Sequence, residues 1–544
     1  MHSAAPIVKL SNAARSTARL TWSSVRRSRR QDHAGQTGEV PASSAAEPAW
    51  VPHLPAGVAP ASVDLVAGGS LTGSWLQRWA ADGDRPVLID DDRPWVRAGE
   101  LEDRSRRTAG RLAGLGLRRG DRLLVSAAPS VDLVVTYVAA LRLGLVVVPV
   151  NTAYRAGEIA HVVADASPAA AVVDDRRRAG WVAAAAGGAG ITVVGVGVEG
   201  TEAASDGLDA AGLDDPALLL YTSGTTGLPK GAPLTQANLL ASAAAVGAAW
   251  RWTPEDRLVL ALPLFHLHGL GVGLHGTFTA GAAAIIRPRF DPGDVVEAAA
   301  GHDASLFFGV PTMYSRLASA GRLEGLSGLR LCVSGSAPLS VELHDAVARE
   351  GGQRIIERYG MTETVMLVSN PHDGDRRPGS VGLPLPGVDV RLADGTDEIE
   401  VRGPNVFAGY WQRPEATAES FDDGWFRTGD VGAHDGDGYL RIVGRSKELI
   451  ISGGYNVYPR EVEDVLRSCP GVGDVAVVGC ADAEWGEVVV AHVESADHGV
   501  DEAAILTWAA ERLAPHKRPK RVHFVAALPR NALGKVTKGE LVDG

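Results

Sequence analysis

The residues with the most evident chemistry follow a short apolar run, residues 217–221, that has the length and composition of a buried strand. The chain then enters a turn of hydroxyls and glycines that ends at Lys230. Glycines let a ligand approach the backbone, amides and hydroxyls donate hydrogen bonds, and the lysine supplies positive charge. These properties predict a polyphosphate site. Its expected members are Thr222, Ser223, Gly224, Thr225, Thr226, Gly227 and Lys230.

The turn differs from the common nucleotide-triphosphatase loop, because Pro229 stands where the Gly-x4-Gly-Lys pattern has its second glycine. A surface turn is the alternative for any three of its residues, whereas the whole run directly after a strand favours a functional loop. Residues 221–231 resemble the phosphate loop of the adenylate-forming superfamily, which includes acyl-CoA synthetases, peptide-synthetase adenylation domains and luciferases.

The resemblance extends over about residues 70 to 540, and further signatures occur in the family's order. It implies an enzyme that uses ATP, Mg²⁺ and coenzyme A to convert a small-molecule carboxylic acid into its thioester through an acyl-adenylate. Several spaced motifs in order are more specific than any one of them. The further signatures are residues 359–364, 428–430, 444–447 and 531–535.

Activation of a carboxylate by ATP brings one anion against another, so catalysis must consist mostly of charge neutralisation and positioning. A hydroxyl at Thr362 and a carboxylate at Glu363 suit the α-phosphate and Mg²⁺. The resemblance implies that these two contact AMP and the metal, that Thr226 is a second metal ligand, and that Tyr359 stacks on adenine. An ordinary helix cap is the alternative for Thr362 and Glu363.

Asp430 follows an aromatic-rich strand and suits the two ribose hydroxyls, which need a bidentate acceptor. A Thr-Gly-Asp triplet by itself is usually a turn, and its place in the series of signatures is what favours ribose. The other residues that the resemblance places around the nucleotide are Gly335, Ser336, Glu357, Gly360 and Arg445.

Lys535 matches the adenylation lysine of the family, a cation on a mobile loop that stabilises charge between the carboxylate and the α-phosphate and then leaves. An exposed tail lysine is the alternative. By resemblance Lys447 occupies the hinge about which a small C-terminal domain swings between two half-reactions. Gly453 and Gly454 would then let the pantetheine arm of coenzyme A pass close to the backbone.

His266, which follows Leu-Pro-Leu-Phe, is expected by resemblance to line the acyl pocket near the thiol tunnel, together with Val310. We also include His266 among the catalytic candidates, although a role as general base is not established by the pattern. A satisfied core histidine and a metal-binding pair with His268 are the alternatives. No further cluster of Cys and His supports the metal.

Arg358 is the residue that indicates the kind of substrate. Strand alternation places it on the same face as Arg354 and Ile356, and it lies nearest the end of the strand where ligands bind. An arginine buried beside an apolar tail is costly, whereas a second carboxylate pairs with it bidentately. The surrounding residues 356–364 are similar to malonyl-CoA synthetases, as are residues 308–313 and 452–459. The pattern therefore predicts malonate or a short malonate-like diacid.

Other interpretations of this region stay open. Arg358 can instead bridge to a neighbouring acid such as Glu357 and ignore the substrate. Arg287 and Arg289 are weaker candidates for the same carboxylate, since their segment also fits a loop.

The elements that must position these residues alternate along the chain. Helical spacing over residues 99–115 and 131–144 alternates with strand-like residues 121–127 and 146–150. Residues 131–150 are apolar enough to suggest a membrane-spanning helix. Asp132, Arg142 and Pro149 favour instead a buried helix that is followed by a strand. Further on, strands are expected at residues 258–262, 305–310, 329–334 and 354–357, with helices from about Thr235, Asp294, Pro311 and Leu339.

Strands separated by helices imply parallel sheets covered on both faces, with ligands at the carboxyl ends of the strands. Four of the suspected stretches follow such ends, at residues 262–266, 309–311, 334–338 and 358–363. The predicted fold class is α/β, with a large N-terminal domain of several subdomains and parallel-rich sheets, and a small mobile α+β C-terminal domain. The expected divisions are a basic, disordered, Ser/Ala/Pro-rich leader over residues 1–65, then residues 66–446 and 447–544.

Composition limits the class of protein. With 544 residues, the chain exceeds a single core, and 45% hydrophobic with 22% charged residues is typical of a globular protein. A formal charge of −12 argues against a nucleic-acid partner. Three scattered cysteines indicate reduced thiols and a cytoplasmic protein. Residues 1–31 carry basic residues and no acid, so an organelle transit peptide is the minority interpretation.

Four functions compete. We expect an acid–CoA ligase acting on malonate; a ligase for a fatty or aryl monocarboxylic acid is the alternative within the same fold. A stand-alone adenylation enzyme that loads a separate carrier protein is another. An oxygenase on this scaffold is the last, because the motifs do not distinguish it from a ligase. The sequence does not indicate an oligomeric state.

Overall fold

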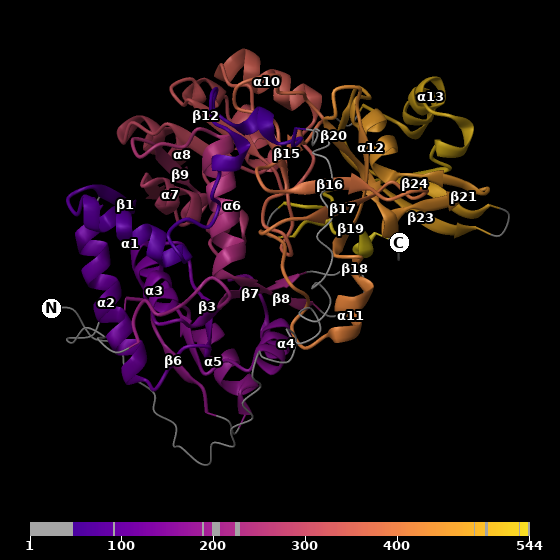
Figure 1. Ribbon diagram of the computed structural model, residues 1–544. Coiled ribbons are helices and arrows are strands. Elements are labelled where there is room, and N and C mark those ends of the chain that lie inside the picture. The colour runs from indigo at the N-terminus through magenta and orange to yellow at the C-terminus, as the bar shows by residue number, and fades with distance from the viewer. Residues whose placement is uncertain are drawn as a thin grey trace, which may run out of the picture.

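The computed structural model describes residues 47–90, 93–187, 190–197, 207–222, 229–482, 485–495, 499–531 and 534–541. Within these residues the strands form four sheets. Two large sheets and their helices make up the left and upper parts of Figure 1, and the C-terminal domain, in gold, lies at the right. The predicted α/β class with a small C-terminal domain is confirmed.

The nine-stranded sheet has the order β15-β14-β13-β12-β11-β9-β10-β1-β2. Neighbours from β13 to β1 pair in parallel, and the edge strands pair antiparallel. The strands are β1 (Pro86–Asp90), β2 (Val96–Arg97), β9 (Arg257–Leu260), β10 (Ala283–Ile286), β11 (Leu306–Gly309), β12 (Leu331–Ser334), β13 (Ile356–Tyr359), β14 (Val368–Ser369) and β15 (Leu383–Pro384).

The six-stranded sheet has the order β6-β5-β3-β4-β7-β8 and is parallel except for the β7–β8 hairpin. This hairpin carries the predicted phosphate loop at its tip, since Thr222 pairs with Lys230. The strands are β3 (Arg122–Ser126), β4 (Val146–Pro149), β5 (Ala170–Val173), β6 (Thr192–Val194), β7 (Pro216–Thr222) and β8 (Lys230–Thr235).

Helices cover both large sheets, and several of them begin at a polar cap. The Ser130 and Ser340 side chains accept from the third residues of α3 and α10, and Thr235 caps α6 as predicted. The helices of the large domain are α1 (Leu71–Ala81), α2 (Ala98–Gly114), α3 (Val131–Arg142), α4 (Ala156–Ala166), α5 (Arg176–Ala185), α6 (Gln236–Ala249), α7 (His275–Ala280), α8 (Pro292–Gly301), α9 (Pro311–Ser319), α10 (Val341–Gly351) and α11 (Pro414–Glu419).

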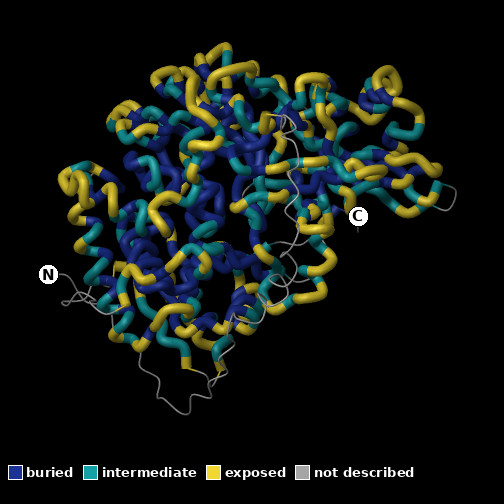
Figure 2. Tube along the Cα trace, in the orientation of Figure 1, coloured by how far each residue is buried: buried dark blue, intermediate teal, exposed yellow. Residues whose placement is uncertain are grey.

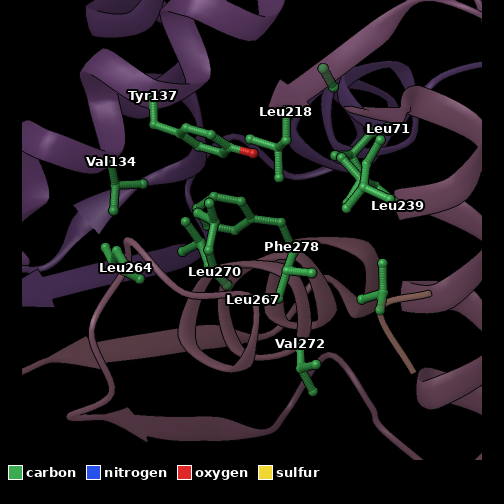
Figure 3. Close-up of a cluster of buried hydrophobic side chains, with 14 of the residues drawn as sticks. Leu71, Val134, Tyr137, Leu218, Leu239, Leu264, Leu267, Leu270, Val272 and Phe278 are labelled. Atoms are coloured by element: carbon green, nitrogen blue, oxygen red, sulfur yellow. The ribbon is translucent and has the colours of Figure 1, made fainter. Parts of the chain in front are cut away.

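The main core lies where the two large sheets meet, and it appears as the dark blue interior of Figure 2. Figure 3 shows Leu218 of β7 and Leu239 of α6 near Tyr137 of α3 and residues of the π-helix η5 (His268–Leu274). A π-helix is uncommon and is often found beside a functional site. Here it begins two residues after His266, so the core packing holds that segment against the strand that leads to the phosphate loop.

Two antiparallel-rich sheets follow. The first contains β16 (Asp389–Leu392), β17 (Glu398–Arg402), β18 (Phe421–Asp422), β19 (Trp425–His434) and β20 (Leu440–Arg445). The chain then passes through η7 (Ser446–Glu448) into the second, which packs on α12 (Pro459–Arg467) and α13 (Glu502–Arg512) around its own core. Its strands are β21 (Ile450–Ser452), β22 (Tyr455–Val457), β23 (Val472–Asp482), β24 (Gly486–Ser495) and β25 (Arg521–Val525).

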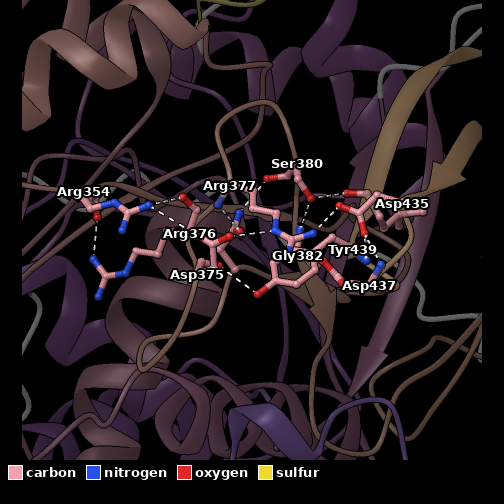
Figure 4. A network of polar contacts seen from close by, with 11 residues as sticks. Arg354, Asp375, Arg376, Arg377, Ser380, Gly382, Asp435, Asp437 and Tyr439 are labelled. Atoms are coloured by element: carbon pink, nitrogen blue, oxygen red, sulfur yellow. Dashed lines mark hydrogen bonds and ion pairs between the residues drawn. The ribbon is translucent and has the colours of Figure 1, made fainter.

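A polar network ties the loop after β14 to the β19–β20 turn, as Figure 4 shows. The Arg377 guanidinium donates to Asp375 (2.9 Å), Asp435 (2.6 Å) and Asp437 (2.6 Å), and it lies 4.0 Å from the ring centroid of Tyr439. The same loop carries the backbone of Gly379 to Glu357, beside the candidate site.

Three expectations need correction or refinement. Residues 47–65, expected within a disordered leader, contain short helices at Val51–His53 and Pro60–Ser62, and His53 is buried with its Nε2 3.1 Å from the Leu383 carbonyl oxygen. Strand β13 begins at Ile356, so the exposed Arg354 precedes it and does not share the environment of Arg358. Residues 131–150 form the buried α3 and β4, and no described helix has the length and apolarity to cross a membrane.

Candidate active site

Four neighbouring parallel strands, β9, β11, β12 and β13, end along one edge of the nine-stranded sheet. The four stretches singled out from the sequence follow or overlap these ends, which confirms their predicted position in the fold. Because parallel strands direct their carboxyl ends to the same edge, these segments form one site. The residues of the four stretches include His266, Val310, Gly335, Ser336 and Arg358.

A second wall of the site is built around the buried carboxylate of Asp430 in β19. The Tyr359 hydroxyl donates to Asp430 Oδ2 over 2.6 Å, and Arg445 Nε lies 3.0 Å from Asp430 Oδ1. An ionised carboxylate has about four acceptor positions, so both oxygens can accept a further hydrogen bond. The geometry brings an aromatic face, an acceptor pair and a cation together, as a nucleoside monophosphate requires.

Arg358 is buried at the end of β13, and its Nε and Nη2 atoms have no hydrogen-bond partner among the described residues. It also forms no ion pair with Glu357 or with any other acid that the structure describes. Burial lowers the pKa of Arg358 to about 9. A Cβ on Gly335 would lie 2.4 Å from Arg358 Nε, so only glycine leaves room for the guanidinium here.

Two histidines face this arginine. The backbone N–H of His268 donates to His266 Nδ1 (3.3 Å), and Ser336 Oγ lies 3.3 Å from His268 Nδ1, while His268 Nε2 has no partner within the described chain. Burial, and then the charge of Arg358, lower the pKa of His266 to about 4 and that of His268 well below its usual range. Both rings are therefore neutral at pH 7, and Arg358 carries the positive charge of this pocket.

Glu357 and Gly360 lie on either side of Arg358 and Tyr359. Glu357 is buried and accepts from the Gly379 N–H (2.9 Å), and burial raises its pKa to about 7. At Gly360 a Cβ would lie 2.0 Å from the carbonyl oxygen of Val365, so the chain turns too tightly there for a side chain. These two residues shape the segment that presents Tyr359.

Lys535 reaches the same region from the C-terminal domain. Burial and then the nearby Arg445 lower its pKa, while Glu448 and Asp430 act in the opposite direction, so the lysine lies among residues of the site. The preceding Gly534 has φ +74°, and a Cβ on it would lie 2.6 Å from Thr312 Oγ1 at the start of α9. This contact seats the lysine loop on the large domain.

A largely apolar cavity of about 380 Å³, with two arginines in its wall, adjoins the strand ends and reaches Gly534. It contains Val310, whose side chain is buried, and the cationic side chains of Arg289 and Arg316. The two arginines can bind an anionic group of a ligand, while the rest of the lining is mostly apolar.

Family models match two parts of the chain. Residues 76–411 match the model of the AMP-binding enzymes, and residues 461–535 match that of the AMP-binding enzyme C-terminal domain. The chain belongs to the AMP-binding enzyme family.

Relatives of this AMP-binding enzyme cover most of its length. It is 39% identical to a feruloyl-CoA synthase of an Amycolatopsis species over 484 residues, which is 86% of this chain and 98% of that protein. It is 36% identical to a malonate–CoA ligase of Arabidopsis thaliana over 477 residues, which covers 79% and 78% of the two chains.

Two solved structures show the same fold. ATP-bound MatB of Rhodopseudomonas palustris has 40% identity and a TM-score of 0.83, over 87% of this chain and 98% of MatB. MenE of Bacillus subtilis, an o-succinylbenzoate–CoA synthetase bound to ATP and magnesium, has 31% identity and a TM-score of 0.78, over 86% and 99%. The AMP-binding enzyme described here is an AMP-forming acid–CoA ligase whose substrates include ATP and coenzyme A and whose metal is Mg²⁺.

The residues present fit a divalent cation at Glu363. This carboxylate is buried and forms no ion pair with any described Lys, Arg or His, and burial raises its pKa. Its Oε1 accepts from the Tyr410 hydroxyl over 2.9 Å. A buried carboxylate without a cationic partner is an appropriate ligand for Mg²⁺, which takes few protein ligands and many phosphate oxygens. The adjacent Thr362 is half-buried.

Some predicted residues lie elsewhere or outside the described part. Ser223, Gly224, Thr225, Thr226 and Gly227 are outside the described residues, whereas Thr222 and Lys230 flank them in β7 and β8. Lys447, Gly453 and Gly454 are exposed. Strand β21, which leads to the two glycines, lies on the side of the C-terminal domain away from the large domain (Figure 1), so this arrangement does not bring them to the site.

The sequence interpretation missed Tyr410. It lies 47 positions from Glu363 and contacts it only in the folded chain. The local sequence, a Gly-Tyr pair before a turn, does not indicate a functional residue. Only the contact with Glu363 in the folded chain shows that Tyr410 belongs to the site.

Proposed function

We propose that this enzyme ligates malonate, or a short malonate-like diacid, to coenzyme A through an acyl-adenylate. The observation that carries the proposal is Arg358, a buried guanidinium with two unpartnered nitrogens, Nε and Nη2, in the wall of the site. A buried charge without a partner is costly, and a carboxylate that binds Nε and Nη2 side by side offsets that cost.

The neighbours of Arg358 favour a dianion over an apolar acid. Ser336 can donate to His268 Nδ1, which leaves Nε2 of that neutral ring as a second donor toward the ligand. His266, also neutral, contributes a polar ring without competing for negative charge. The distal carboxylate of malonate would then meet one cation and one N–H donor, while its reacting carboxylate points toward the nucleotide.

In the first half-reaction we assign the nucleoside to Tyr359, which offers its ring to adenine, and to Asp430, which accepts from ribose. Lys230 and Thr362 bind phosphate oxygens. Lys535 places a cation between the reacting carboxylate and the α-phosphate, where negative charge accumulates. Mg²⁺, held by Glu363 when bound, neutralises phosphate charge. Attack of the carboxylate oxygen on the α-phosphorus then releases pyrophosphate.

For the second half-reaction we propose a rotation about Lys447, at the boundary between residues 66–446 and 447–544. The thiol of coenzyme A must attack the acyl carbon and release AMP, and Lys535 has to leave for the thiol to enter. The exposed Gly453 and Gly454 would then approach the site and flank the pantetheine arm. We place the enzyme in the cytoplasm, because its three cysteines are free thiols.

A ligase for an aryl monocarboxylic acid is the second candidate. The 39% identity to a feruloyl-CoA synthase favours it, and the cavity of about 380 Å³ has room for more than a malonyl group. Arg358 argues against it, because ferulate leaves the guanidinium without a carboxylate.

Release of pyrophosphate by the purified full-length protein tests the proposal. Malonate, methylmalonate, succinate, propionate, octanoate and ferulate are offered with ATP, Mg²⁺ and coenzyme A, and the thioester is identified by mass spectrometry. We expect kcat/KM to be highest for malonate or its methyl derivative. Preference for ferulate would support the second candidate, and no pyrophosphate release with any acid would reject both.

A further inference from the structure

Tyr410 contacts two charged groups that belong to different walls of the site. Its hydroxyl donates a 2.9 Å hydrogen bond to Glu363 Oε1. Its ring lies beside the Lys230 ammonium, with Nζ 5.0 Å from the ring centroid. A phenol suits both contacts, because its π face attracts a cation and its hydroxyl donates to a carboxylate. One side chain thus joins the base of the phosphate loop to the buried acid.

The side chain of Tyr410 is fixed by its own surroundings. Its backbone N–H donates to Thr417 Oγ1 (2.9 Å), and its ring packs edge-on against Phe407 at a centroid distance of 5.0 Å. The Phe407 N–H in turn donates to the Glu363 carbonyl oxygen (2.8 Å). Backbone and side chain of Glu363 are therefore both bonded to the same short segment.

The residues after Tyr410 hold the two strands of the β7–β8 hairpin. The Trp411 N–H donates to the carbonyl oxygen of Gly231 in β8 over 2.8 Å. Asp165 accepts from Arg413 (2.6 Å) and from the hydroxyl of Tyr221 in β7 (2.8 Å). Movement of the hairpin is thereby coupled to movement of the segment that carries Tyr410.

We propose that Tyr410 is a positioning residue that sets the Glu363 carboxylate and the Lys230 ammonium relative to each other, so that Mg²⁺ and the phosphates of ATP bind as one unit. This inference rests on the proposed function, which assigns Glu363 to the metal and Lys230 to phosphate. Loss of a hydrogen bond that orients a metal-binding carboxylate commonly lowers metal affinity or activity by about 10- to 100-fold.

Two substitutions separate the two contacts. Tyr410→Phe removes the hydroxyl but keeps the ring beside Lys230, so it acts through Glu363 alone. It should weaken binding of Mg·ATP about tenfold and leave binding of metal-free ATP unchanged. Tyr410→Leu removes the ring as well, so it should weaken ATP binding both with and without metal.

Isothermal titration calorimetry of the full chain with ATP, in MgCl₂ and in EDTA and without any acid, measures these affinities directly. Tyr439→Phe is the matched control, since Tyr439 also lies against a cation, Arg377, and donates to the Asp375 carbonyl oxygen (3.0 Å). The control should bind ATP like the wild type in both buffers.

The inference is overturned if Tyr410→Phe binds Mg·ATP like the wild type, or loses the same factor in EDTA. A second measurement does not depend on the Leu variant folding: in a Glu363→Gln background, Tyr410→Phe should have no further effect on Mg·ATP binding. The wild type is assayed for pyrophosphate release in parallel. Wild-type binding of Mg·ATP without activation of any acid would reject the proposed function alone, and an active wild type with an unaffected Phe variant would reject the role of Tyr410 alone.

Discussion

The hydroxyl of Tyr359 donates to Asp430 Oδ2 over 2.6 Å, although the two residues are 71 positions apart in the sequence. The other carboxylate oxygen of Asp430 lies 3.0 Å from Arg445 Nε. The ring that we assign to adenine and the carboxylate that we assign to ribose therefore support each other before any nucleotide binds. A hydrogen bond to an ionised acceptor is shorter and stronger than a neutral one, which suits this role.

Tyr359→Phe keeps the ring and removes this bond. We expect the KM for ATP to rise about tenfold with a smaller change in kcat, because a hydrogen bond to a charged group contributes about 1.5–3 kcal/mol. Steady-state kinetics with ATP varied at saturating acid measures the change. Tyr359→Leu removes the ring too and should bind ATP more weakly than the Phe variant. An unchanged KM in Tyr359→Phe would show that Asp430 is held well enough by Arg445 alone.

Arg358→Ala tests the choice of acid. The variant should lose malonate turnover by about a hundredfold or more in kcat/KM, since breaking a buried ion pair costs about 3–5 kcal/mol. Propionate and octanoate, which offer no second carboxylate, should be affected far less. Equal losses with all acids would identify a structural arginine. Arg289→Ala, in the neighbouring cavity, is the control, and if it rather than Arg358→Ala removed malonate selectivity, the second carboxylate would bind at Arg289.

Glu357 gives the stability of the protein a defined pH dependence. Burial raises its pKa from 4.5 to about 7, so the folded chain binds more protons than the unfolded chain between these values. Stability from this group is therefore present at low pH and is lost as the pH rises through about 7. Glu357→Gln keeps an acceptor for the Gly379 N–H and removes the buried charge.

The free energy of unfolding of Glu357→Gln relative to the wild type should consequently increase from pH 5 to pH 8, by on the order of 3 kcal/mol. Urea unfolding of both proteins at the two pH values measures it. Glu415→Gln, at an exposed position of α11, controls for the change in net charge. A pH-independent difference would mean that Glu357 is not buried as a charged group.

Much of the fold was predictable because local patterns and packing agree. A strand expected at residues 329–334 is observed as Leu331–Ser334, and a helix expected at 131–144 as Val131–Arg142. Both are apolar segments of ordinary length bounded by turn residues, so periodicity alone identifies them. The leader boundary at residue 65 was wrong for residues 47–65, because Pro, Ala and Ser predict a linker while the burial of His53 depends on the distant Leu383.

The candidate site was predictable where a motif carries the residue, and not where only three-dimensional contact does. Arg358 stands out as a charge at the ligand end of a strand, but whether Glu357 neutralises it depends on the fold, in which the Gly379 N–H donates to the Glu357 carboxylate. Tyr410 had no such signal, since its two partners come from distant segments: Glu363 lies in the turn after β13, and Lys230 begins β8. The local sequence identifies the chemical type of a side chain, whereas its contact partner depends on the tertiary structure.

The contact between Gly534 and Thr312 leads to a further prediction about the two half-reactions. Gly534 has φ +74° and its Cα faces Thr312 so closely that a Cβ would lie 2.6 Å from Oγ1. In Gly534→Ala the left-handed backbone is strained and the loop has to move off α9. Adenylate formation should then slow by about 10- to 100-fold, because a displacement of about 1 Å at a reacting group costs that much.

The second half-reaction supplies the internal control. Thioester formation from a supplied acyl-adenylate should be nearly unchanged in Gly534→Ala and in Lys535→Ala, whereas Lys535→Ala should abolish adenylate formation. Single-turnover assays of each half-reaction with the same enzyme preparations measure both rates. Thr312→Ala removes the partner instead, and in the Gly534→Ala background it should restore part of the lost adenylation rate. Equal slowing of both half-reactions would show that the Gly534 loop is needed for folding of the C-terminal domain and not for seating Lys535.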